Sequence, residues 1–324
     1  MKYFYSSFLI VAIGIILSYF IGGIYAVYIT ILLAILEISL SFDNAVVNAK
    51  ILQTMEKKWQ DRFILYGIPI AVFGMRFVFP IILVSFAAGL GFFETFNMAI
   101  NDATQYKETL ESTQNIIYAF GASFLLMVFL DFLFDADRED KWIKIIEHNQ
   151  IVNKAGEVNN IEMIIATGFG LILIYLTNDV SIAMAYFGGI FLHSLIASLD
   201  ELLNTDGVRS GIIGFIYLEI LDASFSFDGV IGAFALSSNI FIIMIGLGIG
   251  AMFVRSLTLY MVEKKTLTEY KYLEHGAHYA ILALALIMFL KIFFHINEVI
   301  IGTIGVLFIA ISAYHSIKEN KKSQ

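Results

Sequence analysis

Long apolar runs dominate this chain and restrict its fold more than any other feature. A helix needs about 20 mostly apolar residues to cross the hydrocarbon core of a bilayer, and the sequence contains ten such runs separated by polar breaks. We therefore expect an all-α polytopic membrane protein with about ten transmembrane helices. The expected spans are residues 4–22, 25–49, 63–90, 115–134, 161–177, 181–199, 211–236, 239–262, 276–295 and 298–315.

The composition supports this fold class and excludes several others. Of the 324 residues, 59% are hydrophobic and 15% are charged, whereas about 25% of the residues in an average soluble domain are charged. The absence of Cys excludes disulfide scaffolds, thiolate metal sites and thiol catalysis. The net charge of -8 leaves no basic surface for a nucleic acid. The expected partner is the lipid bilayer.

The positive charges indicate an orientation. Of the 20 Lys and Arg residues, sixteen fall in the termini and alternate loops of one side, whereas Lys107 and Lys291 fall on the other. Because cytoplasmic loops retain positive charge, both termini are expected to be cytoplasmic. The longest cytoplasmic segment would then be a linker at residues 135–160.

Two similar polar motifs interrupt the apolar runs. The first is E-I-S-L-S-F-D-N-A-V at residues 37–46, and the second is D-A-S-F-S-F-D-G-V-I at residues 222–231. Both have an acid, then two Ser residues in alternation, then Phe-Asp, and the matched positions keep a constant offset of 185 residues. The next span of each half continues the similarity, because Gly67 and Arg76 have the same spacing as Gly246 and Arg255.

The positions of the motifs predict an inverted repeat. The motifs lie in the second and seventh expected spans, five crossings apart, so the two copies run through the membrane in opposite directions. Transporters with this architecture place a substrate site near the midplane, where the halves meet. We expect a first half at residues 1–180, which includes the linker, and a second half at residues 181–324.

Each motif also carries residues that interrupt helices. Glu37 and Asp43 are six residues apart, as are Asp222 and Asp228, so each pair would lie about 120° apart on an unbroken helix. Ser, Asp, Asn and Gly favour helix caps and breaks, and they cluster beside the second acid of each motif. We predict that both helices break near the midplane, so that both acids of each motif face one polar cavity.

These acids need partners, because a charge near the bilayer centre costs about 2.5 kcal/mol or more. One interpretation is structural, with Arg76 and Arg255 each pairing with an acid and holding the helices in register. The other is cation binding, since carboxylate, hydroxyl and amide oxygens suit Mn²⁺, Mg²⁺ or Ca²⁺. The expected metal ligands are Glu37, Asp43, Asn44, Asp222 and Asp228, and the expected supporting residues are Ser41, Ser226, Arg76, Arg255 and Glu219.

The two motifs resemble those of the TerC-like integral membrane proteins, named for tellurium resistance. The resemblance is strongest to a longer TerC-related branch of unknown function within the LysE-like transporter superfamily. It runs over most of the chain and is carried by E-I-S-L-S-F-D-N-A-V-V-N-A and L-D-A-S-F-S-F-D-G-V-I-G-A-F-A. It implies Mn²⁺ efflux across the bacterial inner (plasma) membrane, with Glu37, Asp43, Asp222 and Asp228 in the ion site. Gly229 stands where TerC proteins commonly have Ser.

The preferred interpretation is a secondary transporter of divalent metal ions, not an enzyme, with Mn²⁺ as the favoured substrate and no organic cofactor. Two alternatives stay open. One is a non-transporting membrane scaffold of a stress-resistance (tellurium-type) or secretion complex. The other is a diaspartyl intramembrane hydrolase that uses Asp43 and Asp228, although the chain has no G-x-G-D segment. A homo-oligomer is compatible with the sequence.

Overall fold

The computed structural model describes residues 2–321 apart from 136–137, 139, 148, 204–210, 238, 265 and 297. These residues form helices and no β-strand. Six helical segments are long and apolar enough to cross a membrane, which confirms a helical membrane protein but not the expected count of ten spans. The six segments are Tyr5–Leu40, Ile70–Ala88, Ala103–Phe134, Val180–Leu199, Ile240–Lys264 and Leu273–Lys291.

The chain divides into two compact units, each built from two separate stretches of sequence. The first unit contains Met1–Gln114 and Leu203–Lys264, and the second contains Asn115–Leu202 and Lys265–Gln324. Each unit therefore takes helices from both sides of the expected boundary at residue 180. The expected halves at 1–180 and 181–324 are the two copies of a sequence repeat, not compact units, and this repeat stays a prediction.

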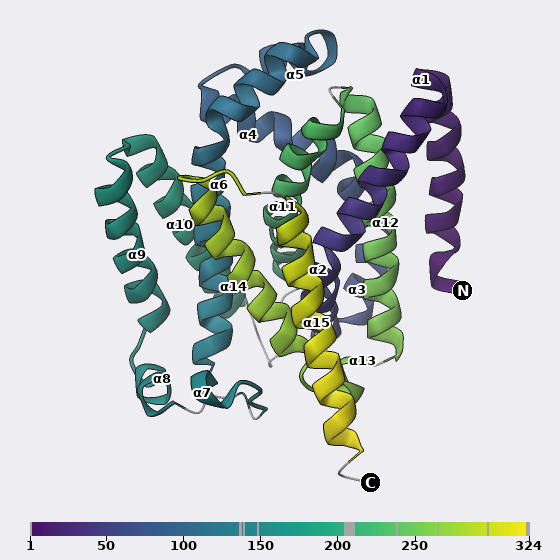
Figure 1. Cartoon of the computed structure of the whole chain (residues 1–324). Helices are drawn as coiled ribbons and strands as arrows, with labels where there is room; N and C mark the ends of the chain where they lie inside the picture. The colour runs from purple at the N-terminus through teal and green to yellow at the C-terminus, as the bar shows by residue number, and fades with distance from the viewer. Residues whose placement is uncertain are drawn as a thin grey trace. The chain divides into compact units, whose positions relative to one another are not determined.

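The first unit begins with a helical hairpin. Helix α1 (Tyr5–Leu40) has non-helical backbone angles at Gly22 and Gly23, where the chain reverses (Figure 1). Gly23 has a φ of 66° and a ψ of -155°, a conformation that only glycine adopts readily. Ser18 and Thr30 face each other across the hairpin, with 2.7 Å between their hydroxyl oxygens. The expected break between residues 22 and 25 is present.

Helix α12 is the central packing element of the first unit, because it contacts α1, α2 and η2. It approaches α1 closely through small residues. A Cβ on Gly246 would lie 2.6 Å from Leu33 Cβ, and one on Gly250 would lie 2.5 Å from Glu37 Cβ. Besides α1, the unit contains α2 (Phe42–Gln53), α3 (Lys57–Pro69), η2 (Ile70–Val78), α4 (Phe79–Ala88), α5 (Phe92–Asn101), α11 (Gly211–Leu236) and α12 (Ile240–Lys264).

The expected span at residues 63–90 is not one regular helix. Helix α3 ends at Pro69, the next nine residues form the π-helix η2, and α4 follows. The wider hydrogen bonding is visible where the Phe79 N–H donates to the Gly74 carbonyl, five residues earlier. Pro69 has no N–H to donate and its ring clashes with a regular helical turn, which disfavours a continuous α-helix here. π-Helical turns are rare and frequently occur at functional sites.

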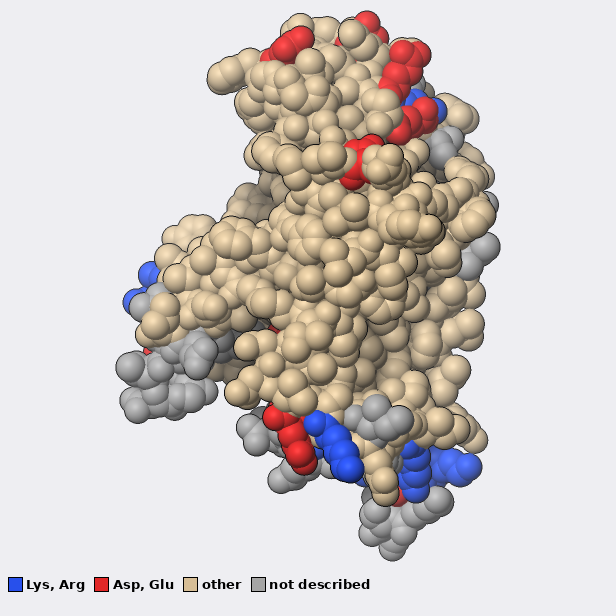
Figure 2. Space-filling model, turned by 90° about the vertical axis from the view of Figure 1, so that its left-hand side faces the viewer, with Lys and Arg blue, Asp and Glu red and all other residues tan. Residues whose placement is uncertain are grey.

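Acidic side chains gather at one end of the first unit. Figure 2 shows them at the top, over α5 and the beginning of α6 (Ala103–Phe134). The exposed acids are Glu94, Asp102, Glu108 and Glu111, against the single cation Lys107. Such an excess of negative charge raises the local concentration of cations.

The second unit contains the remaining helices. Helices α14 and α15 pack side by side (Figure 1), and Gly276 of α14 leaves room for Ser312 of α15. Besides most of α6, the unit contains α7 (Lys144–Glu147), α8 (Gln150–Ala155), α9 (Ile161–Thr177), α10 (Val180–Leu203), α13 (Thr266–Glu269), α14 (Leu273–Lys291) and α15 (Glu298–Asn320).

One buried acid fastens the linker at residues 135–160 to α14. Glu147 is 1% exposed and accepts a hydrogen bond from the Tyr279 hydroxyl at 3.0 Å. Its other partners are the backbone N–H groups of Trp142 and Ile143 and the side chains of Arg138 and His275. Burial by itself raises the pKa of Glu147, but the hydrogen bonds from His275 and the two amides outweigh it and lower the pKa to about 2.

We predict that Glu147→Gln lowers the free energy of unfolding by about 3 kcal/mol, because the pKa falls from 4.5 to about 2 on folding. The wild-type charge contributes fully above about pH 4.5, and its contribution is lost as the pH falls towards 2. Fluorescence of Trp142 in a Trp59→Phe background, followed against pH in detergent, reports this loss. Glu157→Gln, which changes an exposed acid of the same linker, is the control. An unchanged acid profile in Glu147→Gln would contradict the prediction.

Candidate functional site

Arg76 lies at the centre of a buried network in the first unit. It projects from η2 and is 1% exposed. Its Nη2 donates to Glu37 Oε1 at the end of α1, and its Nη1 donates to Asp222 Oδ2 of α11 at 2.7 Å. One guanidinium therefore bridges the first acids of the two motifs.

Two further predicted residues complete this network. Asn44 Nδ2 donates to Asp222 Oδ1 at 2.6 Å, and Ser41 Oγ donates to Glu37 Oε1 at 3.0 Å. The network thus joins α1, α2, η2 and α11 through side-chain hydrogen bonds. The structure brings together three expected ligands, Glu37, Asn44 and Asp222, with the expected supporting residues Ser41 and Arg76.

The first motif breaks where the sequence predicts. Helix α1 ends at Leu40, Ser41 has a φ of -109° and a ψ of 16°, and α2 begins at Phe42. Glu37 therefore lies in the last turn of α1. Asp43 is buried in the first turn of α2, where the helix dipole favours a negative charge.

The second motif does not break, contrary to the prediction, because α11 is continuous from Gly211 to Leu236. Ser224 Oγ donates to the Ile220 carbonyl one turn earlier, so its hydroxyl is satisfied within the helix. The Asp222 carboxylate is engaged by Arg76 and Asn44 and so does not cap a backbone N–H group. The side chain of Asp228, the second acid of this motif, lies outside the described residues.

Arg255 has a different environment from Arg76. It pairs with Glu219 at 3.3 Å, donates to the Phe63 carbonyl at 2.8 Å, and lies 4.1 Å above the centroid of the Phe63 ring. Its guanidinium fills the space beside Gly67, where a Cβ would lie 1.1 Å from Nη1. The two arginines are therefore not equivalent, since Arg76 bridges both matched acids and Arg255 pairs with the additional acid Glu219.

Several oxygens in this region are buried without a hydrogen-bond partner among the described residues. They are Glu37 Oε2, Asn44 Oδ1, Glu219 Oε2 and Ser226 Oγ. Glu37 Oε2 faces the α11 backbone, because a Cβ on Gly229 would lie 3.1 Å from it. Buried polar atoms are normally hydrogen-bonded, so these four oxygens are available to a ligand.

The buried charges of the described part of the first unit do not balance. Glu37, Asp43, Glu219 and Asp222 are buried acids, and Arg76 and Arg255 are the buried cations. If all six are ionised, two negative charges remain. No group of three or more His, Cys, Asp or Glu side chains in the described chain has a geometry that could hold a metal ion. In this conformation the carboxylates of Glu37 and Asp222 hold Arg76.

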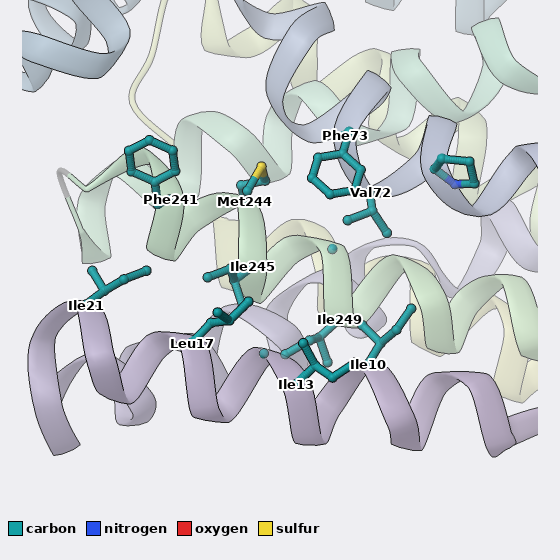
Figure 3. A pocket seen from close by; sticks show the side chains of 13 residues that line it. Ile10, Ile13, Leu17, Ile21, Val72, Phe73, Phe241, Met244, Ile245 and Ile249 are labelled. Carbon is teal, nitrogen blue, oxygen red and sulfur yellow. The ribbon is translucent and has the colours of Figure 1, made fainter.

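An apolar cavity of about 420 Å³ lies on another side of η2. Figure 3 shows its lining side chains, which come from α1, the end of α3, η2 and α12. Three of the lining residues, Pro69, Val72 and Phe73, precede Arg76 in the chain by three to seven residues. Gly248 of α12 also lines the cavity and lies close to Val72. The cavity has no charged lining residue among those described and is therefore unsuited to a cation.

A family model described as "Protein of unknown function (DUF475)" matches residues 42–323. The chain belongs to the DUF475 family. No curated protein and no solved structure gives a significant match to it. The region matched by the DUF475 model includes Asp43, Arg76, Asp222 and Arg255, whereas Glu37 precedes it.

Sequence reasoning missed two features of this DUF475 site. The first is the π-helix that carries Arg76, for which Pro69 is the available signal. The second is the cradle that Phe63 and Gly67 form around Arg255. The equal spacing of glycine and arginine in the two halves suggested that both pairs mattered, but it did not show that a glycine of the first half receives an arginine of the second.

We predict that Gly67→Ala destabilises this DUF475 protein by about 3 kcal/mol or more, because the new Cβ would displace the Arg255 guanidinium and leave Glu219 unpaired. Thermal unfolding of the purified protein in detergent measures the change. The matched control is Gly168→Ala in α9, where nothing lies within 4 Å of the added Cβ and a small stabilisation is expected. Equal unfolding midpoints for the two variants would rule out the cradle.

Proposed function

We propose that this DUF475 protein is a secondary transporter of divalent metal ions, with Mn²⁺ as the favoured substrate. The observation that carries the proposal is the set of buried, unpartnered oxygens on Glu37, Asn44, Glu219 and Ser226. They lie on α1, α2 and α11, and the first three of these residues belong to the network of ion pairs and hydrogen bonds around Arg76 and Arg255. Carboxylate, amide and hydroxyl oxygens are the ligands that Mn²⁺ and Mg²⁺ prefer.

The buried charge supports a divalent substrate. If the four buried acids and the two arginines are all ionised, two negative charges remain among the described side chains of the first unit. Uncompensated charge is costly at membrane depth, and one divalent cation would neutralise this excess. Asp43, for which no described cation forms an ion pair, would then contribute its carboxylate from the first turn of α2. Asp228 is proposed as the corresponding ligand from the second motif.

The composition of the units supports the proposed inverted repeat. In such a repeat, the second and third spans correspond to the seventh and eighth, and the fourth and fifth correspond to the ninth and tenth. The first compact unit contains the second, third, seventh and eighth spans. The second compact unit contains the fourth, fifth, ninth and tenth spans. The bridge from Glu37 to Asp222 through Arg76 likewise joins one acid from each proposed half. Repeats of this kind support alternating access to a site near the midplane.

The remaining parts of the proposal come from the TerC resemblance and the charge distribution. We propose efflux across the bacterial inner (plasma) membrane, with both termini in the cytoplasm. The acidic end formed by α5 and the beginning of α6 would then face outward. We further propose that α2 moves relative to α1 at the break at Ser41 when the site opens.

Mn²⁺ flux into proteoliposomes tests the proposal. We expect Glu37→Gln, and separately the double variant Asp43→Asn with Asp228→Asn, to reduce the flux by about tenfold or more, because each removes anionic ligands. Glu37→Gln is nearly isosteric and keeps an oxygen that can accept from Ser41 and Arg76. Mg²⁺, Ca²⁺ and Zn²⁺ as competitors would rank the substrates.

Glu108→Gln is the matched control, since it neutralises an exposed acid at the acidic end and should leave the maximal flux unchanged at physiological salt. Unfolding midpoints establish that all the proteins compared are folded. Absence of flux for every ion in folded wild-type protein would refute the transport proposal and favour a membrane scaffold.

A further inference from the structure

We infer that the Arg76 guanidinium is a tethered cation that holds the transport carboxylates between binding events, and that the divalent ion must displace it to bind. This inference rests on the proposed transport function and identifies the competitor at the same site. It assigns Arg76 a direct role in ion exchange, beyond holding helices together.

The geometry prevents Arg76 and a divalent ion from binding these carboxylates at the same time. Arg76 donates to Glu37 Oε1 and Asp222 Oδ2, and these two carboxylates belong to the expected ligand set. A guanidinium presents several N–H donors in a rigid planar fork, which suits bridging of this kind. A divalent cation bound to either oxygen of these carboxylates, including the unpartnered Glu37 Oε2, would lie within a few ångströms of the guanidinium charge, where like charges repel strongly in a medium of low dielectric constant. The ion and Arg76 therefore cannot share both carboxylates.

The Arg76 charge also compensates the carboxylates of the site after the transported ion has been released. Carboxylates left unpaired at membrane depth would carry a large desolvation cost. Arg76 compensates Glu37 and Asp222 together, and Ser41 and Asn44 satisfy further lone pairs of the same carboxylates. The carboxylates of Glu37 and Asp222 are thereby compensated without a bound metal.

The helix that carries Arg76 is suited to movement. In an α-helix each residue turns the chain by about 100°, so converting the π-helical stretch to regular α-helix would turn Arg76 relative to the preceding residues. An apolar cavity lies beside Val72 and Phe73 (Figure 3), although Val72 also packs against Gly248 of α12. Arg76 Nε has no hydrogen-bond partner among the described residues. Displacement therefore breaks only the bonds from the two terminal nitrogens, which reach Glu37, Asp222 and the Ala71 carbonyl.

Arg255 provides an internal contrast. It projects from the regular helix α12, stacks on the Phe63 ring and donates to the Phe63 carbonyl. Its guanidinium fills the space that Gly67 leaves. Arg255 thus has the features of a fixed structural cation. Arg76 binds the two carboxylates that the ion requires, and its backbone partner among the described residues, the Ala71 carbonyl at 3.2 Å, belongs to its own helix η2.

The test measures Mn²⁺ binding to purified protein in detergent, from the loss of the electron paramagnetic resonance signal of free Mn²⁺. We expect Arg76→Ala to bind Mn²⁺ about tenfold more tightly than wild type or better, because the competing charge is gone. Low millimolar guanidinium chloride should weaken Mn²⁺ binding to Arg76→Ala competitively and leave wild type unaffected. A role of Arg76 in folding alone would not produce this competition.

The matched control is Arg138→Ala, which removes an arginine paired with Glu147 in the second unit and should leave the Mn²⁺ affinity unchanged. If Arg76→Ala does not fold, Arg76→Lys serves instead. It keeps the charge but loses the fork, so its Mn²⁺ affinity should exceed that of wild type. Wild-type protein that transports Mn²⁺, with a folded Arg76 variant that binds it no more tightly, would overturn the tethered-cation inference alone. Wild-type protein without binding or flux would overturn the proposed function itself, and the inference with it.

Discussion

A single buried guanidinium between two carboxylates is the interaction on which the first unit depends. Arg76, Glu37 and Asp222 come from three helices that are far apart in sequence, and none of the three charges is stable alone in a low-dielectric interior. The ion pairs therefore tie the end of α1, the π-helix η2 and the middle of α11 to one point. Burial of this kind adds little net stability, but it specifies which helices meet and in which register.

Small residues determine where these charges can lie. Gly250 allows α12 to approach α1 at the level of Glu37, and Gly246 does the same one turn away at Leu33. Gly229 brings the α11 backbone near the unpartnered oxygen of Glu37. With larger side chains at these positions, the helices would be farther apart and the carboxylates could not share one guanidinium. Close packing through glycine, which is common in membrane helices, here serves the placement of polar groups.

The apolar pattern of the sequence predicted where helices form, because long apolar runs favour helices, but six of the described segments, not ten, are long and apolar enough to cross a membrane. The segments expected at 161–177 and 211–236 match α9 and α11. The paired motifs also indicated that Glu37, Asp43 and Asp222 would be buried. The pattern did not predict whether a polar motif would break its helix, because that depends on tertiary partners. Ser41 lies at a break, whereas the matched Ser226 lies within the continuous helix α11, where Asp222 is held by Arg76 from another helix.

The sequence also did not predict which acids each arginine would pair with. Charge matching by repeat position suggested one acid per arginine, yet Arg76 binds two acids and Arg255 binds Glu219. The π-helix accounts for part of this difference, since it gives Arg76 a direction that a regular helix would not. Sequence periodicity assumes a constant turn per residue, and that assumption fails over Ile70–Val78.

The reversal at Gly22 and Gly23 bears on how the chain enters the membrane during synthesis. The two arms of α1 are joined by almost no loop, and the hydroxyls of Ser18 and Thr30 satisfy each other. The arms can therefore insert together as a preformed hairpin, with few polar groups left facing lipid.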